Sequence, residues 1–292
     1  MYLGFHLSMV YSNPCFDDYL RLLIMKIIVL LLTAGYSFLT WSADTQKSWL
    51  EPVTGMEFLW IEKGCFKMGN RYSDGQDDEK PVHEVCLDGY WLGKYEVTQG
   101  QWKKIISKNP ARNKKGDDYP VETVSWKKVQ KFMTSLGERS KASFNLPSEA
   151  QWEYACTSGG KKQKFAGFSD KSKMVEYANI CDKNCKYGWK NKSQDDGFKK
   201  TAPVGHYKAN GLGVYDLSGN VWEWVRDAYD TKAYANHAKN NPVQEPTKKK
   251  IARVYRGGAW RGSNKEARCA DRRSFNQGYT YSGLGFRLIK EN

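Results

Sequence analysis

The sequence predicts a single mixed α+β domain in which much of the chain is irregular. Three observations favour this class. Loosely alternating apolar stretches bounded by glycines occur before residue 98, and three amphipathic or apolar stretches each begin at a helix-capping residue. Beyond Cys156 the regular patterns fade, and Gly, Asn, Asp, Trp and Tyr dominate. There is neither a repeat of fixed period nor a clear linker, so one domain is expected.

Strands are expected first. The stretch Met56 to Met68, MEFLWIEKGCFKM, alternates loosely between glycines and predicts one strand. A polar loop follows, and Val82 to Tyr95 predicts one or two further strands. If these strands pair, Cys65 and Cys86 are brought together.

Three helices are expected next, capped by Thr98, Ser125 and Ser148. The second, SWKKVQKFMTSLGERS, carries its apolar residues on one face. In the third, SEAQWEYAC, Gln151 completes a capping box with Ser148.

The second half of the chain is expected to be mostly loops. Residues 230–250 read as a solvated insertion, because polar residues and lysines dominate there. Buried irregular backbone must still find hydrogen-bond partners. Disulfides, buried tryptophans and bound cations are the usual devices that hold such chain in place, and this sequence has candidates for all three.

The N-terminal part predicts export. From Met25, a lysine is followed by a long apolar run, and Thr40 and Ser42 occupy the −3 and −1 positions for cleavage before Ala43. Residues 1–42 are therefore read as an extension and signal peptide, with Met25 as an alternative start, residues 43–55 as a short N-terminal segment, and residues 56–290 as the domain. An uncleaved anchor helix is the alternative, but the run is short for a stable membrane span. The mature protein is expected in the periplasm or outside the cell.

The net charge and the number of cysteines limit the classes of function that are expected. The formal charge is +14, yet the lysines are scattered, several beside acids, and no basic helix is evident. Solvated loop charge explains this better than nucleic-acid binding, although an acidic glycan or anionic surface stays open as a partner. Of seven cysteines, Cys15 precedes the cleavage point. The other six predict three disulfides in an exported protein, with the pairing open.

Several short stretches, in this order, resemble the formylglycine-generating-enzyme, or sulfatase-modifying-factor, family. They are MGN near Gly69, KYEVTQGQW (94–102), LPSEAQWEYAC (146–156), YANIC (177–181), DDGFKKTAPVG (195–205), NGLGVYDLSGNVWEW (210–224), RGGAW (256–260) and GLGFR (283–287). The resemblance runs from about Met56 to the C-terminus. It implies a variant of the C-type-lectin-like fold, mixed α and β with much irregular structure.

The resemblance also implies two structural calcium sites. The first would use side-chain oxygens of Asn179 and Asp196 with carbonyls of Ile180 and Phe198; the second would use Asp216 and Glu223 with carbonyls of Gly219 and Val221. All are hard oxygen ligands, which calcium requires. The family usually has Asn where this chain has Asp216. Turn capping is the alternative role for these polar residues.

The cysteines acquire partners through the same resemblance. It pairs Cys156 with Cys269, Cys181 and Cys185 can close a small loop, and Cys65 is left with Cys86. A second family disulfide would involve the positions of Met133 and Leu288, which are both apolar here.

Catalysis is not expected at the family's usual place. Active members bind copper through a cysteine pair before the RCA cysteine, but Gly262 occupies one position and no cysteine lies between Gly257 and Arg268. Copper(I) prefers soft thiolates, so no copper site and no catalytic residue are predicted. Cys269 alone could be a reactive thiol in a basic pocket, but a disulfide in an oxidising compartment is favoured.

Other catalytic arrangements find little support in the sequence. A three-histidine iron site would require His83, His206 and His237 to converge from a strand, a turn and the insertion. Trp222 and Trp224 could line a pocket, but buried core tryptophans are the favoured interpretation.

A ligand-binding surface is predicted instead near the C-terminus. Its residues are polar, aromatic or small, a mixture typical of adaptable binding loops: Trp222, Arg261, Ser263, Asn264, Asp271, Arg273, Phe275, Tyr279 and Tyr281. Such residues suit the diversified display proteins within the family, and ordinary surface variation would look the same.

The leading hypothesis is a secreted, calcium-stabilised binding or accessory protein whose ligand is a protein, peptide or glycan. The alternative is an oxidoreductase that acts in protein oxidation, generating formylglycine on a CxPxR substrate through a non-standard site.

Overall fold

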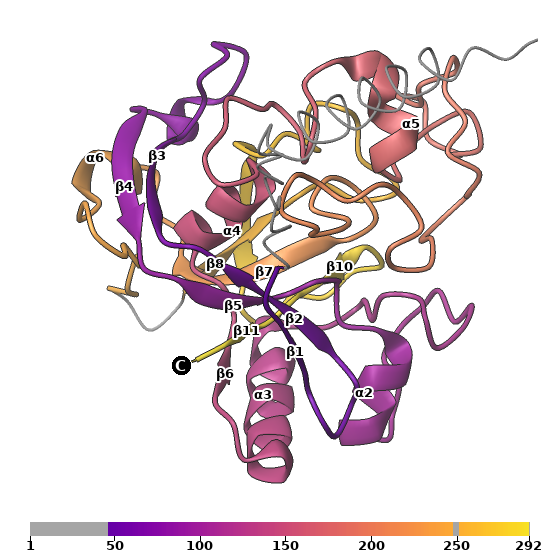
Figure 1. Cartoon of the computed structure of the whole chain (residues 1–292). Helices are drawn as coiled ribbons and strands as arrows, with labels where there is room; N and C mark the ends of the chain where they lie inside the picture. The colour runs from indigo at the N-terminus through magenta and orange to yellow at the C-terminus, as the bar shows by residue number, and fades with distance from the viewer. Residues whose placement is uncertain (1–45, 248–250, 292) are drawn as a thin grey trace, which may run out of the picture. The chain divides into compact units, whose positions relative to one another are not determined.

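A five-stranded antiparallel sheet with the order β1-β2-β5-β11-β6 runs through the domain (Figure 1). The computed structural model describes residues 46–247 and 251–291, and the predicted signal peptide lies outside them. The strands are β1 (Ser48–Leu50), β2 (Glu57–Ile61), β5 (Tyr90–Gly93), β6 (Phe144–Asn145) and β11 (Ile289–Lys290). The last strand in sequence therefore pairs between two early ones and fixes the C-terminal segment to the sheet.

This sheet divides the apolar interior into two cores. In β2, Phe58 faces one core while Leu59 and Ile61 face the other, as the alternation of a strand buried on both faces requires. The first core also contains Trp102 and Phe132, and the second contains Trp152.

Three capped helices cover the two faces. α2 (Gln99–Ile105) and α3 (Trp126–Ser140) lie together below the sheet in Figure 1, and α4 (Glu149–Cys156) lies on the other side. The three predicted N-caps are confirmed, because Thr98, Ser125 and Ser148 each accept a hydrogen bond from the backbone N–H three residues later. Gln151 closes the expected capping box with Ser148.

A hairpin of β3 (Gly64–Met68) and β4 (His83–Leu87) forms a separate two-stranded sheet. The prediction of one strand over Met56–Met68 was therefore wrong. The chain leaves the main sheet after β2 at Glu62 and Lys63, which are exposed, and starts a new strand at Gly64. Val82–Tyr95 holds two strands, β4 and β5.

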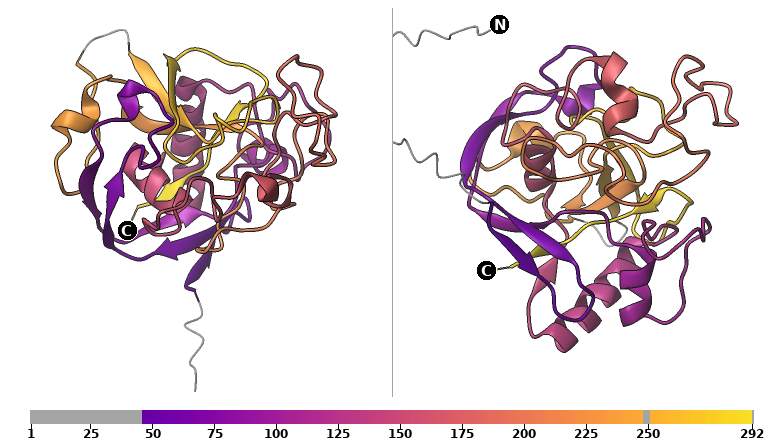
Figure 2. Two further views of the ribbon diagram at one scale, coloured as in Figure 1. Left: turned by 90° about the horizontal axis from the view of Figure 1, so that it is seen from above. Right: turned by 45° about the vertical axis from the view of Figure 1, so that its right-hand side comes forward.

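A four-stranded sheet, ordered β10-β7-β8-β9, supports the C-terminal loops. Its strands are β7 (Trp222–Ala228), β8 (Ala252–Arg256), β9 (Arg272–Asn276) and β10 (Leu284–Gly285), and β10 is parallel to β7. The chain between α4 and β7 contains only a 3-10 turn (Lys171–Lys173) and α5 (Met174–Tyr177) as helical pieces. In both views of Figure 2 much of this irregular chain, salmon to orange, lies away from the β3–β4 hairpin, although Gly160, just after α4, contacts Phe66 of β3.

The insertion at 230–250 is not simply solvated, which corrects the prediction. It contains α6 (Ala233–Asn236), whose Tyr234 is only 2% exposed. The Tyr234 hydroxyl accepts a hydrogen bond from Arg256 Nη1 at 3.0 Å. A phenol can bury its ring and still reach a charged partner, so this segment packs onto the domain despite its polar composition.

The predicted class, mixed α and β with much irregular structure, is confirmed. Within the residues that the structure describes, no helix has the length and apolar character needed to cross a membrane.

Candidate functional site

A cavity of about 430 Å³ opens where the loop of Tyr187 and Trp189 meets residues 261–266 and the four-stranded sheet with its C-terminal loop. Its lining is aromatic and charged: Tyr187, Trp189, Trp222, Tyr255, Arg261, Gly262, Glu266, Arg273, Tyr279 and Tyr281. The set contains neither cysteine nor histidine. We refer to these ten residues as the aromatic pocket. Its volume is within the range of about 300–1,000 Å³ that is usual for small-molecule sites.

Most of the predicted ligand surface belongs to this pocket or its rim. Trp222, Arg261, Arg273, Tyr279 and Tyr281 line it. Three further predicted residues do not line the pocket. Phe275 stacks on Tyr279, which does line it, and Ser263 and Asn264 are partly exposed in the segment that carries Arg261.

Asp271 differs from the rest of the predicted surface, because it is only 1% exposed. Its carboxylate accepts a hydrogen bond from Arg273 Nε at 3.0 Å. Asp271 is therefore a buried partner that orients Arg273, which lines the pocket.

Four lining residues were missed by the sequence analysis: Tyr187, Trp189, Tyr255 and Glu266. A detectable signal existed for two of them. Tyr187 and Trp189 follow a short cysteine loop in a glycine- and lysine-rich stretch, where an exposed tryptophan is hard to explain by packing. Tyr255 and Glu266 reach the pocket only through the fold.

Gly262 lies in the wall of the pocket, at the position where the family resemblance places a thiolate. A Cβ built on Gly262 would lie 2.5 Å from Glu266 Oε2. The space that a side chain at this position would enter therefore already holds a carboxylate.

The loop that carries Tyr187 and Trp189 is fixed to the same wall. Cys181 and Cys185 form a disulfide, and Cys181 N–H donates to the Gly262 carbonyl at 2.9 Å. Trp189 Nε1 donates to the Arg261 carbonyl at 2.9 Å. Two hydrogen bonds thus hold the aromatic loop against the arginine-bearing segment, and the disulfide closes the loop on itself.

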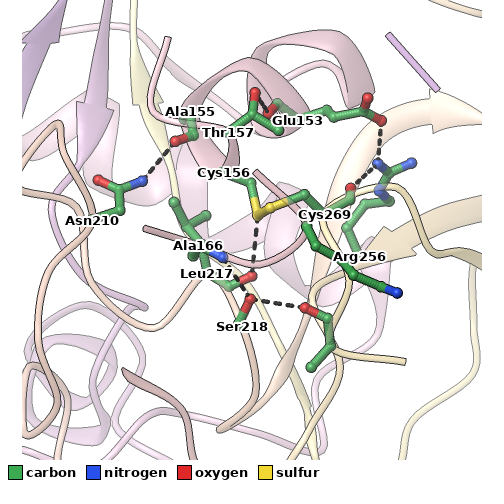
Figure 3. Close-up of a disulfide and its surroundings, with 12 residues drawn as sticks. Glu153, Ala155, Cys156, Thr157, Ala166, Asn210, Leu217, Ser218, Arg256 and Cys269 are labelled. Carbon is green, nitrogen blue, oxygen red and sulfur yellow. Dashed lines mark hydrogen bonds and ion pairs between the residues drawn. A yellow bond between two sulfur atoms is a disulfide. The ribbon is translucent and has the colours of Figure 1, made fainter. Parts of the chain in front are cut away.

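The disulfide between Cys156 and Cys269 joins the end of α4 to the segment that precedes β9 (Figure 3). Arg256 bridges the two sides, because its Nη2 donates to Glu153 Oε2 at 2.6 Å and to the Cys269 carbonyl. Ser218 Oγ donates to the Ala267 carbonyl at 2.8 Å. Cys269 is 1% exposed and bonded to sulfur, so it is not a reactive thiol in this structure.

All six cysteines of the described residues are paired, since Cys65 and Cys86 form the third disulfide across the β3–β4 hairpin. These are the three pairs that the sequence analysis expects. Three disulfides indicate an oxidising compartment.

The residues expected to hold the first calcium ion lie together. Asp196 accepts hydrogen bonds from the backbone N–H groups of Ile180 (2.8 Å) and Phe198 (2.9 Å). Asn179 is fully buried, and its side-chain oxygen has no hydrogen-bond partner. Burial raises the pKa of Asp196 to about 7, although both backbone N–H groups lower it. An unpartnered buried oxygen beside a destabilised carboxylate fits a bound cation.

The second expected site lies next to the first in space, because Gly219 of the second set contacts Asn179 of the first. Gly219 has φ +90°, and a Cβ there would lie 2.2 Å from the Asn179 carbonyl oxygen, so only glycine fits. Asp216 Oδ2 accepts from Gly205 N–H at 2.7 Å, while its buried Oδ1 has no partner. Burial raises the pKa of Asp216 to about 6, against the opposing effects of the Gly205 N–H and Arg287.

Glu223, the other carboxylate of the second set, is already engaged by Arg287 at 2.7 Å through both oxygens. Glu96, missed by the sequence analysis, is also buried, and burial together with Asp216 and Glu223 raises its pKa. Glu223 thus pairs with Arg287, and the same arginine is the cation that acts electrostatically on Asp216 and Glu96. A cation would offset the excess negative charge.

No three His, Cys, Asp or Glu side chains within the described ranges are grouped closely enough to hold a metal by themselves. Either calcium site would therefore depend on carbonyl and amide oxygens as well. The carbonyls of Ile180, Phe198, Gly219 and Val221 remain candidates for this, as the sequence analysis proposed.

Two of the three histidines considered for an iron site converge. His83 Nε2 and His237 Nδ1 lie 3.1 Å apart, whereas His206 packs against Phe198 and Tyr207. Trp224 is fully buried, with its Nε1 bonded to the Val124 carbonyl, in agreement with the core interpretation. Trp222 both packs in the core and lines the pocket.

Comparison with known proteins gives a consistent picture. A family model described as "Sulfatase-modifying factor enzyme 1-like domain" matches residues 45–292. The serine/threonine-protein kinase Pkn1 of Chlamydia trachomatis is 30% identical over 262 residues, which cover 80% of this chain. The chain spans only 38% of the length of that kinase.

Two further relatives match over most of both chains. The formylglycine-generating enzyme of Mus musculus is 28% identical, covering 82% of this chain and 77% of the relative. The "Inactive C-alpha-formylglycine-generating enzyme 2" of Bos taurus is 24% identical, covering 82% and 90%.

Solved structures share the fold. PvdO from Pseudomonas aeruginosa superposes with a TM-score of 0.72 at 24% identity, covering 85% of this chain and 98% of that one. Treponema denticola variable protein 1 gives a TM-score of 0.70 at 24% identity, covering 85% and 99%.

Proposed function

Because the chain belongs to the sulfatase-modifying factor enzyme 1-like domain family, we propose that it is a calcium-stabilised member that binds a ligand in the aromatic pocket and does not oxidise a substrate thiol. Family membership alone does not decide between these roles. One relative is named a formylglycine-generating enzyme, and another is named an inactive one.

The observation that carries the proposal is the wall of the pocket at Gly262. No cysteine lines the pocket, and the carboxylate of Glu266 fills the space into which a side chain at 262 would project. Copper(I) needs soft thiolate ligands, and the six cysteines of the described residues are all held in disulfides. Six aromatic side chains with two arginines and one glutamate make instead a surface suited to recognition.

Two titrations on the mature protein test this directly. We expect denatured but unreduced protein to show no free thiol, and copper(I) in the presence of a competing chelator to remain with the chelator. One copper per chain, lost on blocking cysteine thiols, would overturn the proposal. The mouse formylglycine-generating enzyme serves as the positive control.

Calcium would act as a structural ion at the two sites described above. Asn179, Asp196 and the carbonyls of Ile180 and Phe198 would hold one ion; Asp216, Glu223 and the carbonyls of Gly219 and Val221 would hold the other. The ion would neutralise buried carboxylates and satisfy the unpartnered oxygens of Asn179 and Asp216.

Chelation tests the calcium proposal. With calcium at about 100 times its Kd, binding to the folded state alone stabilises by about 2.7 kcal/mol per site. We therefore expect a chelator to lower Tm by several degrees, and Asp196→Asn to reduce that difference. An equal Tm with and without calcium in the wild-type protein would exclude structural calcium.

We also propose that the protein is exported by the apolar segment that begins at Met25 and is cleaved before Ala43. The three disulfides support an oxidising destination. N-terminal sequencing of the exported protein should start at Ala43, and recovery of the uncleaved chain from membranes would favour an anchor instead.

A further inference from the structure

Two exposed aromatic plates lie at the aromatic pocket or its rim. Tyr187 and Trp189 stack with ring centroids 4.8 Å apart, and Phe275 and Tyr279 stack at 3.5 Å. Trp189 is 60% exposed and Phe275 is 42% exposed, which makes them two of the four large apolar side chains that are exposed in the described residues. Within each pair, one ring covers a single face of the other. Flat apolar faces left in water beside a cavity are typical of ligand contacts.

The Tyr187–Trp189 plate is held in place before a ligand arrives. The Cys181–Cys185 disulfide and the hydrogen bonds to the carbonyls of Arg261 and Gly262 fix the Trp189 loop. A site that is rigid in its free state loses little conformational freedom on binding, so more of the contact energy appears as affinity.

The charge around the plates is positive. The guanidinium of Arg261 lies over the ring of Tyr281 at 4.3 Å and has no carboxylate within ion-pair distance among the described residues. The Trp189 loop adds Lys186, Lys190 and Lys192, and within the described residues none of these lysines forms an ion pair. Unpaired cations beside a concave surface attract an anionic ligand.

The pocket also carries many hydrogen-bond donors and acceptors. Four tyrosine rings, two arginines and Glu266 line one cavity. Hydroxyl groups that both donate and accept suit a ligand with many hydroxyls, and a guanidinium binds a carboxylate or sulfate through two parallel hydrogen bonds. A sugar ring offers an apolar C–H face to an aromatic plate and a rim of hydroxyls to the surrounding polar groups.

Building on the proposed binding role, we propose that the aromatic pocket binds an anionic saccharide, with Trp189 stacked on a sugar ring and Arg261 paired to the saccharide's acidic group. The carboxylate of a uronic acid and the sulfate of a sulfated sugar share the chemistry that Arg261 recognises. An acidic peptide meets the charge requirement but has no fixed alternation of C–H faces and hydroxyls.

Calorimetric titration of the calcium-loaded mature protein can separate these ligands. The probes are a galacturonic acid oligosaccharide, its methyl ester, a heparin-derived oligosaccharide and a poly-glutamate peptide, at one fixed calcium concentration. Esterification removes the charge and keeps the rings, so we expect the ester to bind about tenfold more weakly, the equivalent of one charge-assisted contact. Because a heparin fragment carries sulfates in addition to carboxylates, tighter binding of heparin than of galacturonate would indicate that sulfate contributes to recognition.

Variants place the ligand in the pocket. Arg261→Gln and Trp189→Ala should each weaken saccharide binding about tenfold, and Trp189→Phe should restore much of the loss. Arg112→Gln removes the same charge from an exposed loop outside the pocket and should leave binding unchanged. Unchanged binding in both pocket variants would overturn the assignment.

Other results would overturn either the anionic saccharide or the binding role itself. Equal affinity for the acid and its ester, or no saccharide binding at all, would refute the anionic saccharide. If poly-glutamate binds instead and depends on Trp189 and Arg261, the ligand class is wrong while the binding role stands. Stoichiometric copper bound by thiols would refute the binding role itself, so the two failures are distinguishable.

Discussion

Gly262 and Glu266 determine at the residue scale what the pocket can do chemically. A Cβ at residue 262 meets the end of a flexible glutamate side chain, whereas a Cβ at residue 219 meets backbone. Glycine therefore occupies positions 262 and 219 for different reasons. Gly262 leaves room for a neighbouring carboxylate, and Gly219 allows two buried segments to approach each other.

Alanine substitutions should separate these roles. Gly262→Ala should change the free energy of unfolding by less than about 1 kcal/mol, because the Glu266 side chain can move. Gly219→Ala should cost at least about 2 kcal/mol, since it combines a positive φ with contact to the Asn179 backbone. Urea unfolding of both variants checks this. Equal losses would mean that the Gly262 wall is as rigid as the Gly219 contact.

A histidine pair makes stability depend on pH. The Pro81 carbonyl can only accept, so His83 Nδ1 donates to it (3.0 Å) and His83 Nε2 accepts from His237 Nδ1 (3.1 Å). Burial lowers the pKa of His237 to about 4, with Glu149 opposing this and His83 and Arg272 adding to it. The unfolded chain, with a histidine pKa near 6.5, therefore binds more protons between those two values.

Stability from His237 should accordingly be complete above about pH 6.5 and fall as the pH drops toward 4. Because the ring is only half-buried, we expect a modest effect, a further fall in Tm of about 2–4 °C between pH 7 and pH 5. His237→Asn keeps a donor for His83 without titrating, so its Tm should fall less over this range. Parallel curves for the two proteins would show that His237 does not titrate with unfolding.

At the level of secondary-structure elements, short strands, loops and disulfides position the pocket. Two disulfides attach segments near it, but they close loops of very different length: Cys156–Cys269 spans 113 residues and Cys181–Cys185 spans 4. In the chain-entropy view the long loop contributes far more to stability. The short one should matter mainly for the Tyr187–Trp189 plate.

Replacing each disulfide by two alanines tests this division. Loss of Cys156–Cys269 should cost about 5 kcal/mol, and loss of Cys181–Cys185 about 2 kcal/mol. The second variant should nevertheless lose affinity for a pocket ligand, measured by the same calorimetric titration. If it binds as tightly as the wild type, the loop is held by its hydrogen bonds alone.

At the scale of the whole molecule, local signals predicted local structure well. Ser148 with Gln151 and the spacing after Ser125 predicted helices because capping and periodicity are properties of neighbouring residues. The break at Glu62 and the burial of Tyr234 were missed, since both depend on partners far along the chain. Half of the residues that line the pocket belong to the predicted ligand surface, because the resemblance located the C-terminal segment, while Tyr255 and Glu266 enter it only through sheet pairing and loop packing.

Mass spectrometry of a CxPxR peptide can show most directly whether this member of the family, which we propose binds at the pocket, oxidises a substrate thiol. The peptide is incubated with the calcium-loaded mature protein, copper(I) and oxygen, with the mouse formylglycine-generating enzyme as positive control. We predict that every peptide keeps its cysteine sulfur in the presence of this protein. Conversion of the cysteine to formylglycine, in a reaction that thiol-blocking reagents abolish, would show that this protein is an oxidase.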